Sequence, residues 1–392
     1  MRLKPRPRKR PPGWNRRRQG IALILVMLVI MVLAVMASSF ATNMGVEASL
    51  ARNAANDRRI EWLCRSGVEL ARYMVGQQFA EQREPYDALN QRWAGGPGTL
   101  EDCVLNAVNL KESGLAEGSP LWFLLNGDED WENYLSEATL KVKIVDLERK
   151  MNINWVAQGH HDRESIKPVM QEILKIENTV QDTIIDSLVD WVDNDGGDGR
   201  KDKIGLNGAE WQHYEALGYS PKNGLIDDMS ELLLIKGIHG EREWLITRQV
   251  PDDLDEDFRP RMFIPDLFTV VSRGKINVNT APIEVLQMVS PSMMDYTNQI
   301  MLARQGEDGI EGTEFDTPFQ QIGELADPRI GMDANTVSAV SRFLDVRSMT
   351  FEVTVTAVVE NQAKTLVAVV RRENGREEEI KVLYSYWKDS GR

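Results

Sequence analysis

One apolar run, close to the N-terminus, is long enough to cross a membrane. Residues 21–37 are all apolar, and residues 38–41 continue the run without a charge. A helix needs about 20 predominantly apolar residues to span the hydrocarbon core of a bilayer. Lysines and arginines precede the run, whereas the first acidic residue is Glu47. Because basic flanks are retained in the cytoplasm, we expect the N-terminus inside and everything after about residue 42 outside.

The junction before the apolar run indicates how the leader is processed. A cleaved secretory signal has small residues after its apolar core, but here Gly20 precedes the core and follows the basic residues 16–18. This junction resembles the processing site of type IV prepilins and pseudopilins, whose peptidase cuts after the glycine. The resemblance implies a mature protein that begins at Ile21. Leu25 replaces the usual glutamate, a departure typical of the type II secretion minor pseudopilin K. An uncleaved signal anchor is the alternative.

Charge and motifs exclude two classes of function. The net charge is −14, and removing the basic leader, residues 1–20, makes it more negative. A nucleic-acid surface needs clustered Lys and Arg. The excess of acidic residues therefore favours divalent cations or basic proteins as partners. No GxSxG, HExxH or P-loop motif and no Cys/His dyad is present, so nothing supports an enzyme. The cysteines, Cys64 and Cys103, fit a disulfide or two buried thiols equally well. The adjacent His160 and His161 are expected to be exposed in a polar loop.

Hydrophobic periodicity predicts a long helix and one sheet built from distant segments. Apolar residues recur at threes and fours from residue 43 to Pro85, which predicts a membrane and stalk helix over 21–84. Alternation over 139–147 predicts a strand, and further strands are expected from residue 351 onward. Asn374-Gly375 between two of these strands is a strong hairpin signal. We expect the isolated strand to share one antiparallel sheet with the C-terminal strands.

The residues between these strands are expected to form an inserted all-α domain, residues 148–347. Three consecutive domains in a row is the alternative. Within the insertion, residues 150–154, Lys-Met-Asn-Ile-Asn, recur as residues 275–279, Lys-Ile-Asn-Val-Asn. Thr280 can cap a following helix, and Pro282 is tolerated in its first turn. This echo resembles the entry to a helix-hairpin-helix (SAM-like) unit, a motif that either binds DNA or serves as a packing unit. The acidic charge favours packing.

Blocks along nearly the whole chain are similar to the type II secretion pseudopilin K family. They are the leader junction, Asp190–Asp195, Gly208-Ala209-Glu210 with Tyr214, Pro221–Asp227, Glu231–Ile238, Ile276–Pro282 and Phe351-Glu352-Val353. The resemblance implies an α+β pseudopilin fold: a long N-terminal transmembrane and stalk helix packed on an antiparallel sheet, with the large helical insertion. The implied divisions are 1–20 (leader), 21–84 (helix), 85–147 and 348–392 (pseudopilin domain), and 148–347 (insertion).

The family also implies a place in the cell and a set of partners. A member would be a non-enzymatic, single-pass inner-membrane protein whose bulk is periplasmic. It would sit at the tip of the pseudopilus with minor pseudopilins I and J, after contact with the prepilin peptidase and the inner-membrane secretion platform. No nucleic acid is expected. The alternatives are a DNA-binding competence pseudopilin that uses the helix-hairpin-helix unit, and a membrane-anchored hydrolase with unrecognised catalytic residues.

The densest acidic segment is the candidate metal site. Its members are Asp193, Asp195, Asp198 and Asp202, with glycines between them, and Glu210 further on. Calcium takes six to eight oxygen ligands from a flexible loop, and alternating Asp and Gly supplies them. The spacing departs from an EF-hand, because Asp198 stands where glycine belongs and Ile204 where the closing glutamate belongs. The family resemblance implies calcium here, and a solvated acidic loop is the alternative.

Overall fold

The computed structural model describes residues 16–80, 84–96, 103–105, 138–193, 207–360, 362–373 and 380–388. The chain divides into two compact units, residues 1–59 and 60–392. The first unit contributes the start of helix α1, Arg16–Ala80. The apolar segment of this helix is fully exposed. Among the described helices it alone is long and apolar enough to cross a membrane, which is consistent with a single membrane anchor.

The helix prediction is confirmed in its main feature, a single continuous helix of 65 residues. It begins at Arg16, whereas the prediction began at residue 21. Side chains from 21 to 55 are exposed, and burial starts at Asn56 and Ile60, where the second unit begins. The polarity of the helix therefore changes along its length, from apolar all round to amphipathic.

One five-stranded antiparallel sheet forms the centre of the second unit. Its order is β1 (Cys103–Leu105), β2 (Ala138–Asp146), β7 (Thr350–Val359), β8 (Gln362–Arg372) and β9 (Ile380–Lys388). β2 pairs with β7 from Ala138↔Val359 to Asp146↔Phe351. The prediction that the isolated strand joins the C-terminal strands is therefore confirmed. The Asn374-Gly375 turn lies outside the described residues.

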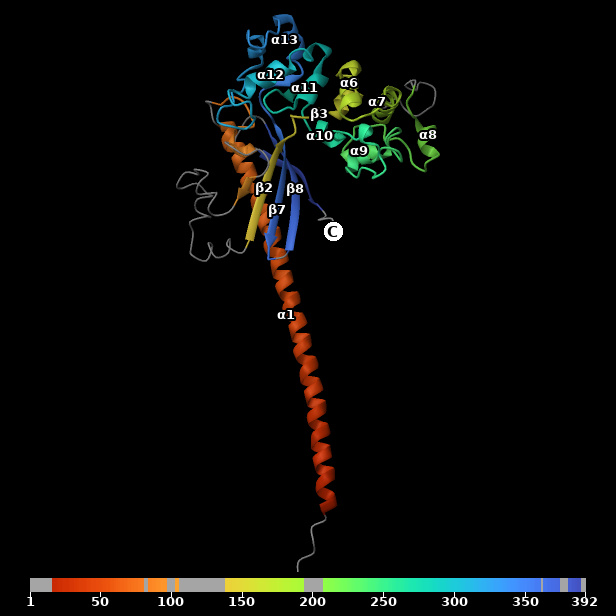
Figure 1. Ribbon diagram of the computed structural model, residues 1–392, viewed down its shortest axis with the longest axis vertical. Helices are drawn as coiled ribbons and strands as arrows, with labels where there is room; N and C mark the ends of the chain where they lie inside the picture. The colour runs from red at the N-terminus through yellow and green to blue at the C-terminus, as the bar shows by residue number, and fades with distance from the viewer. Residues whose placement is uncertain are drawn as a thin grey trace, which may run out of the picture. The chain divides into compact units, whose positions relative to one another are not determined.

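The end of α1 packs on one face of this sheet, and Figure 1 shows it running along β2, β7 and β8. Residues 60, 64 and 75 of the helix and 353 and 355 of β7 belong to one buried core. At Gly67 the contact is so close that a Cβ would lie 2.6 Å from Val355 Cγ1. Cys64 is a free, buried thiol whose Sγ lies 3.8 Å from the Val355 carbonyl oxygen. The side chain of Cys103 is outside the described residues.

The chain between β2 and β7 is mostly helical. Its α-helices are α5 (Ile153–Ala157), α6 (Arg163–Glu172), α7 (Asn178–Val192), α8 (Trp211–Glu215), α9 (Trp244–Thr247), α10 (Ile264–Leu267), α11 (Ile283–Val289), α12 (Thr297–Arg304) and α13 (Ala334–Val340). Its 3-10 helices are η2 (Met229–Leu234), η3 (Glu256–Phe258), η4 (Pro291–Met293) and η5 (Ile322–Ala326), and η1 (Arg92–Ala94) precedes β1.

The expectation that this region is all-α is wrong in one respect. Two short parallel strand pairs lie within it: β3 (Met151–Asn152) with β4 (Phe268–Thr269), and β5 (Ile276–Asn277) with β6 (Leu344–Asp345). Two-residue strands are too short for alternation to reveal them. Both pairs include a copy of the sequence echo, so the repeated sequence corresponds to a repeated structure.

In each copy the second asparagine fixes a distant backbone segment. Asn154 Nδ2 donates to the Ile226 carbonyl at 3.0 Å, and its Oδ1 accepts from Ile226 N at 2.8 Å. Asn279 makes the same two bonds to Phe319, at 2.9 and 2.8 Å. The first asparagine of each copy, Asn152 or Asn277, accepts from the backbone N–H two residues on. These asparagine side chains are buried, so in both copies they hold the same kind of local backbone contact.

Candidate functional site

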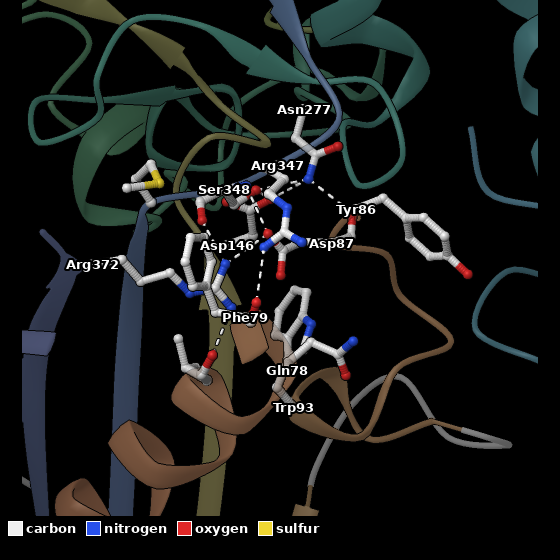
Figure 2. Close-up of polar contacts among 12 residues, drawn as sticks. Gln78, Phe79, Tyr86, Asp87, Trp93, Asp146, Asn277, Arg347, Ser348 and Arg372 are labelled. Carbon is white, nitrogen blue, oxygen red and sulfur yellow. Dashed lines mark hydrogen bonds and ion pairs between the residues drawn. The ribbon is translucent and has the colours of Figure 1, made fainter. Parts of the chain in front are cut away.

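The chain leaves β2 to form the helical region and then returns to β7. A buried polar cluster lies at this point of exit and return. We call it the junction cluster; its members are Asp87, Asp146, Glu148, Asn277, Thr280, Ser348 and Arg372. Figure 2 shows Asp87, Asp146, Asn277 and Arg372 converging on Ser348. Because these residues come from the segment after α1, from two strands and from the helical region, the cluster is where those parts are joined.

An ion pair between Asp87 and Arg372 lies at the cluster's centre. Arg372 Nη1 is 2.7 Å from Asp87 Oδ2, and the two side chains are 1% and 0% exposed. The same guanidinium donates to the carbonyls of Ser348 and Val75, each at 2.7 Å. Its Cζ lies 4.8 Å from the ring centroid of Phe351. A buried charge pair depends on further hydrogen bonds, and both nitrogens of the Arg372 fork have them, whereas Arg372 Nε and Asp87 Oδ1 are buried without a partner among the described residues.

Arg347 holds the chain just beyond α1. Its Nε donates to the Pro85 carbonyl at 2.8 Å, and its other nitrogens reach the carbonyls of Phe79 and Glu84, each at 3.3 Å. The guanidinium also lies over the Phe79 ring, 4.5 Å from its centroid. The last turn of the stalk helix is therefore tied to the residues that precede β7.

Asp146 joins the sheet to the second asparagine copy. Its Oδ2 accepts from Ser348 Oγ and Thr280 Oγ1, both at 2.5 Å, and its Oδ1 accepts from Glu148 N at 2.8 Å. Asn277 Nδ2 donates to Ser348 Oγ at 2.7 Å and to the Asp87 carbonyl at 2.9 Å. Burial raises the pKa of Asp146. The expectation for Thr280 was wrong: it binds Asp146, and α11 has Pro282 at its N-cap.

Glu148 closes the cluster on the other side. Its Oε2 accepts from the backbone N–H groups of Thr350 and Met349, at 2.7 and 3.1 Å, and its Oε1 accepts from Arg273 N at 3.2 Å. Burial, and after it the nearby Asp146 carboxyl, raise the pKa of Glu148 to about 8. One carboxyl thus bridges the exit from β2, the entry to β7 and the helical region.

The raised pKa of Glu148 predicts that stability depends on pH. The folded state binds a proton that the unfolded chain releases above its ordinary pKa of 4.5. The stabilisation is therefore complete below pH 4.5 and is lost as the pH rises through about 8. Each pKa unit is worth about 1.4 kcal/mol. We expect the unfolding free energy of Glu148→Gln to fall less steeply between pH 5 and 9 than that of wild type, measured by urea titration at each pH.

The control for this experiment is Glu352→Gln, because Glu352 is a carboxylate on β7 outside the cluster. The plot of its unfolding free energy against pH should stay parallel to that of the wild type. A Glu148→Gln curve that is also parallel would contradict the assignment of the titration to Glu148.

The structure describes two of the five predicted metal ligands. Asp193 ends α7 as its C-cap, and Glu210 precedes α8 as its N-cap. Asp195, Asp198 and Asp202 fall in 194–206, outside the described residues. In the part of the chain that is described, no three His, Cys, Asp or Glu side chains come close enough to hold a metal ion.

The two ends of the acidic segment nevertheless lie together. A Cβ on Gly208 would be 1.8 Å from Asp190 Oδ2, so Gly208 fits against that carboxylate because it lacks a side chain. Asp190 and Glu210 are 1% and 7% exposed. Burial is the main cause of the raised pKa of Tyr214, and the charges of Asp190 and Glu210 add to it. Carboxylates from both ends of the acidic segment therefore lie near the buried Tyr214 and help to raise its pKa.

The position of the acids in α7 suits a cation. A helix C-terminus carries partial negative charge, so acidic side chains in the last turn are unfavourable there. Asp190 and Asp193 occupy the last turn and the C-cap of α7. Nearby, Lys236 Nζ donates to the carbonyls of Gly208 and Asn207, at 3.0 and 3.2 Å. Asp190, which is buried, and Asp193, which is partly buried, supply oxygen atoms of the kind that a hard cation takes as ligands.

The expectation that both adjacent histidines are exposed is confirmed for His160 and wrong for His161. His161 is 3% exposed, and its ring lies 4.9 Å from that of Phe343 and 6.2 Å from that of Trp155. Burial lowers its pKa to about 4. The polar neighbours in the sequence suggested a loop in solvent, but the ring of His161 packs between those of Trp155 and Phe343.

Two comparisons with known proteins agree with this architecture. The family model for protein K of the type II secretion system matches residues 149–243. No curated protein matches the chain. The structure is similar to a chain in the crystal structure of the GspK-GspI-GspJ complex from the enterotoxigenic Escherichia coli type 2 secretion system. The TM-score is 0.57 at 16% identity, over 87% of this chain and 99% of that one. The matched family is one of structural pseudopilins rather than enzymes. The family match covers residues 149–243, and the structural similarity shows that this chain shares the fold of the solved one.

Proposed function

We propose that the protein is the minor pseudopilin at the tip of the type II secretion pseudopilus, a structural component in the export of folded proteins across the outer membrane. The observation that carries the proposal is the junction cluster, which fixes a large helical region to a sheet packed on a stalk helix. Such an arrangement suits a subunit that presents a rigid head rather than one that performs chemistry. The similarity to a chain solved together with GspI and GspJ supports the same role.

The N-terminal helix supports a place at the tip. Leu25 stands where pseudopilins usually carry a glutamate, so no carboxylate is available there to pair with the amino terminus of a subunit below. A subunit that cannot dock on another in this way suits the first position in the fibre. The helical region, inserted between β2 and β7, would block the addition of a subunit above it. The partners in this proposal are pseudopilins I and J, the prepilin peptidase and the inner-membrane platform.

The proposal also covers two finer features. Each asparagine copy opens a helix-hairpin-helix (SAM-like) unit that serves packing rather than DNA binding, since its asparagine side chains are occupied by backbone bonds. The acidic segment binds calcium, with Asp193, Asp195, Asp198, Asp202 and Glu210 as its ligands. The position of Asp190, buried in the last turn of α7, and of Asp193, partly buried at its C-cap, supports this assignment.

The partner assignment is tested by co-purification. We expect a fragment from about residue 45, which lacks the membrane segment, to elute with the matching fragments of pseudopilins I and J on size exclusion at micromolar concentration. A DNA gel shift on the same fragment should show no binding. Independent elution of the three proteins would count against the proposal, and salt-dependent DNA binding would favour a competence pseudopilin.

Processing gives a second test. If the prepilin route applies, mass spectrometry of the mature protein should find Ile21 at its N-terminus. Replacing Gly20 by a large residue should leave the full-length precursor in the membrane. A wild-type protein that retains residues 1–20 in the presence of the peptidase would favour the uncleaved signal anchor.

A further inference from the structure

The helical region repeats its contacts beyond the two asparagine copies. In each half, a glutamate accepts a hydrogen bond from the backbone N–H that directly follows the segment fixed by the second asparagine. Glu231 Oε1 accepts from Asp227 N at 2.8 Å, and Glu324 Oε2 accepts from Gln320 N at 3.1 Å. The leucine after each glutamate is buried. The two halves therefore have the same order of contacts, and we call them the first repeat, residues 150–238, and the second repeat, residues 275–330.

Both repeats also carry an acidic stretch at the same place. It lies between the second long helix of the repeat, α7 or α12, and the backbone that the asparagine fixes. In the second repeat the stretch is residues 305–316, which contain no base and five acids: Glu307, Asp308, Glu311, Glu314 and Asp316. Burial, and then the charges of Glu311 and Asp308, raise the pKa of Asp316. These acids therefore lie close enough to repel one another.

The repeats differ in the charge at the end of that helix. The last turn and C-cap of α7 hold Asp190 and Asp193, whereas α12 ends on Arg304. A helix C-terminus carries partial negative charge, so a cation is favourable there and an acid is not. The side chain of Arg304 is 4% exposed. The second repeat thus has a buried positive charge at the position where the first repeat has negative ones.

Arg304 contacts three parts of the second repeat. Its Nη1 donates to the Val278 carbonyl, within the asparagine copy, at 2.6 Å. Its Nε donates to Glu311 Oε1 at 2.9 Å, and its Nη2 donates to the same oxygen. The Arg304 carbonyl accepts from Thr317 N at 2.9 Å, which brings the two ends of the acidic stretch together. The guanidinium therefore joins α12, the asparagine copy and the acidic stretch, and it balances part of the negative charge of that stretch.

Resting on the proposed calcium site, we infer that Arg304 is the built-in cation of the second repeat, so that divalent cations act on the first repeat alone. A guanidinium stays charged at every pH at which the protein is folded, and its planar fork matches a carboxylate. Because it belongs to the chain, it holds the acidic stretch of the second repeat without a metal. The first repeat ends the corresponding helix with acids and takes its positive charge from an ion in solution.

Hydrogen exchange of the full-length protein in detergent, followed by mass spectrometry, tests this inference. In the wild type, amides of 305–319 should exchange equally fast in millimolar calcium and in chelator, whereas amides of 207–214 should exchange faster in chelator. Arg304→Met removes the charge, and amides of 305–319 should then exchange about tenfold faster or more, because Glu311 loses its partner. The control is Arg329→Met, which breaks an exposed ion pair with Asp327 in the same repeat and should exchange like the wild type.

Two more variants separate the charge of Arg304 from its hydrogen bonds. Arg304→Lys keeps the charge but loses the planar fork, and Arg304→Gln keeps a donor but loses the charge. We expect the lysine variant to protect 305–319 better than the glutamine variant. Equal protection by the two would overturn the inference, because a cation would then not be needed.

The remaining outcomes distinguish the inference from the calcium proposal. If chelator speeds exchange in 305–319 as much as in 207–214 of the wild type, or if Arg304→Met exchanges like the wild type, the inference is overturned and the calcium proposal stands. If chelator changes exchange in neither repeat, the calcium proposal fails. The comparison of the lysine and glutamine variants then still decides whether Arg304 acts as the cation of the second repeat.

Discussion

Replacing Asp87 by alanine should destabilise residues 60–392 by about 3–5 kcal/mol, the usual cost of removing one partner from a buried ion pair. The side chain of Arg372 is 1% exposed and would keep its charge after losing the carboxylate that is paired with it. Ser348 N, which donates to Asp87 Oδ2 at 2.9 Å, would lose its acceptor as well. Urea denaturation of the fragment from about residue 45, followed by circular dichroism, measures the loss.

Two further variants show whether the cause is the buried charge. Asp87→Ala combined with Arg372→Met removes both charges and should recover part of the loss, because no unpaired ion remains. Asp227→Ala breaks an exposed ion pair with Lys222 and should cost at most about 1 kcal/mol. Equal losses for Asp87→Ala and Asp227→Ala would contradict a central role for the junction cluster.

Calcium should raise the melting temperature of the fragment from about residue 45. The acids at the end of α7 repel one another and the helix dipole, and a cation bound to them would offset both effects. A ligand that binds only the folded state stabilises it by roughly 2.7 kcal/mol at one hundred times its Kd. We expect a higher midpoint in millimolar calcium than in chelator, measured by scanning calorimetry. Magnesium should substitute poorly, because it demands tighter octahedral geometry.

The calcium effect should depend on the acidic segment and not on acidity in general. Asp193→Ala together with Asp195→Ala should abolish the shift and leave the sheet folded. The matched control is Asp255→Ala with Asp257→Ala, two acids at η3 in the same helical region, which should keep the shift. An unchanged melting temperature on chelation, with no calcium found by elemental analysis, would reduce the segment to a solvated loop.

Periodicity was sufficient to predict the parts of the fold that bury one face. β7 alternates between buried and partly buried residues along its length, so its sequence indicated both the strand and its inner side. The long helix was predictable for the same reason, although its exact start was not. Short elements were missed: β3 to β6 are two residues each, and their pairing depends on contacts between distant segments.

The junction cluster could not be predicted, because its members look ordinary in the sequence. Asp146 and Arg372 stand at the ends of strands, where charged residues are common. The ion pair of Arg372 with Asp87 joins residues 285 positions apart, and no local pattern specifies such a distance. The acidic segment gave the opposite result: its composition was conspicuous, and the structure describes only its two ends, Asp193 and Glu210. A dense motif is easier to find than a dispersed one.

The place of the helical region within the sheet has a consequence for the order of folding. Ser348 follows Asp146 by 202 residues, yet the two are hydrogen-bonded. Closing so long a chain segment costs entropy before any contact between β2 and β7 forms. A helical region that is already compact brings Leu147 N to within 2.9 Å of the Thr350 carbonyl and removes most of that cost. We therefore expect the strands that flank the insertion to pair after it has folded, so that the sheet is completed last.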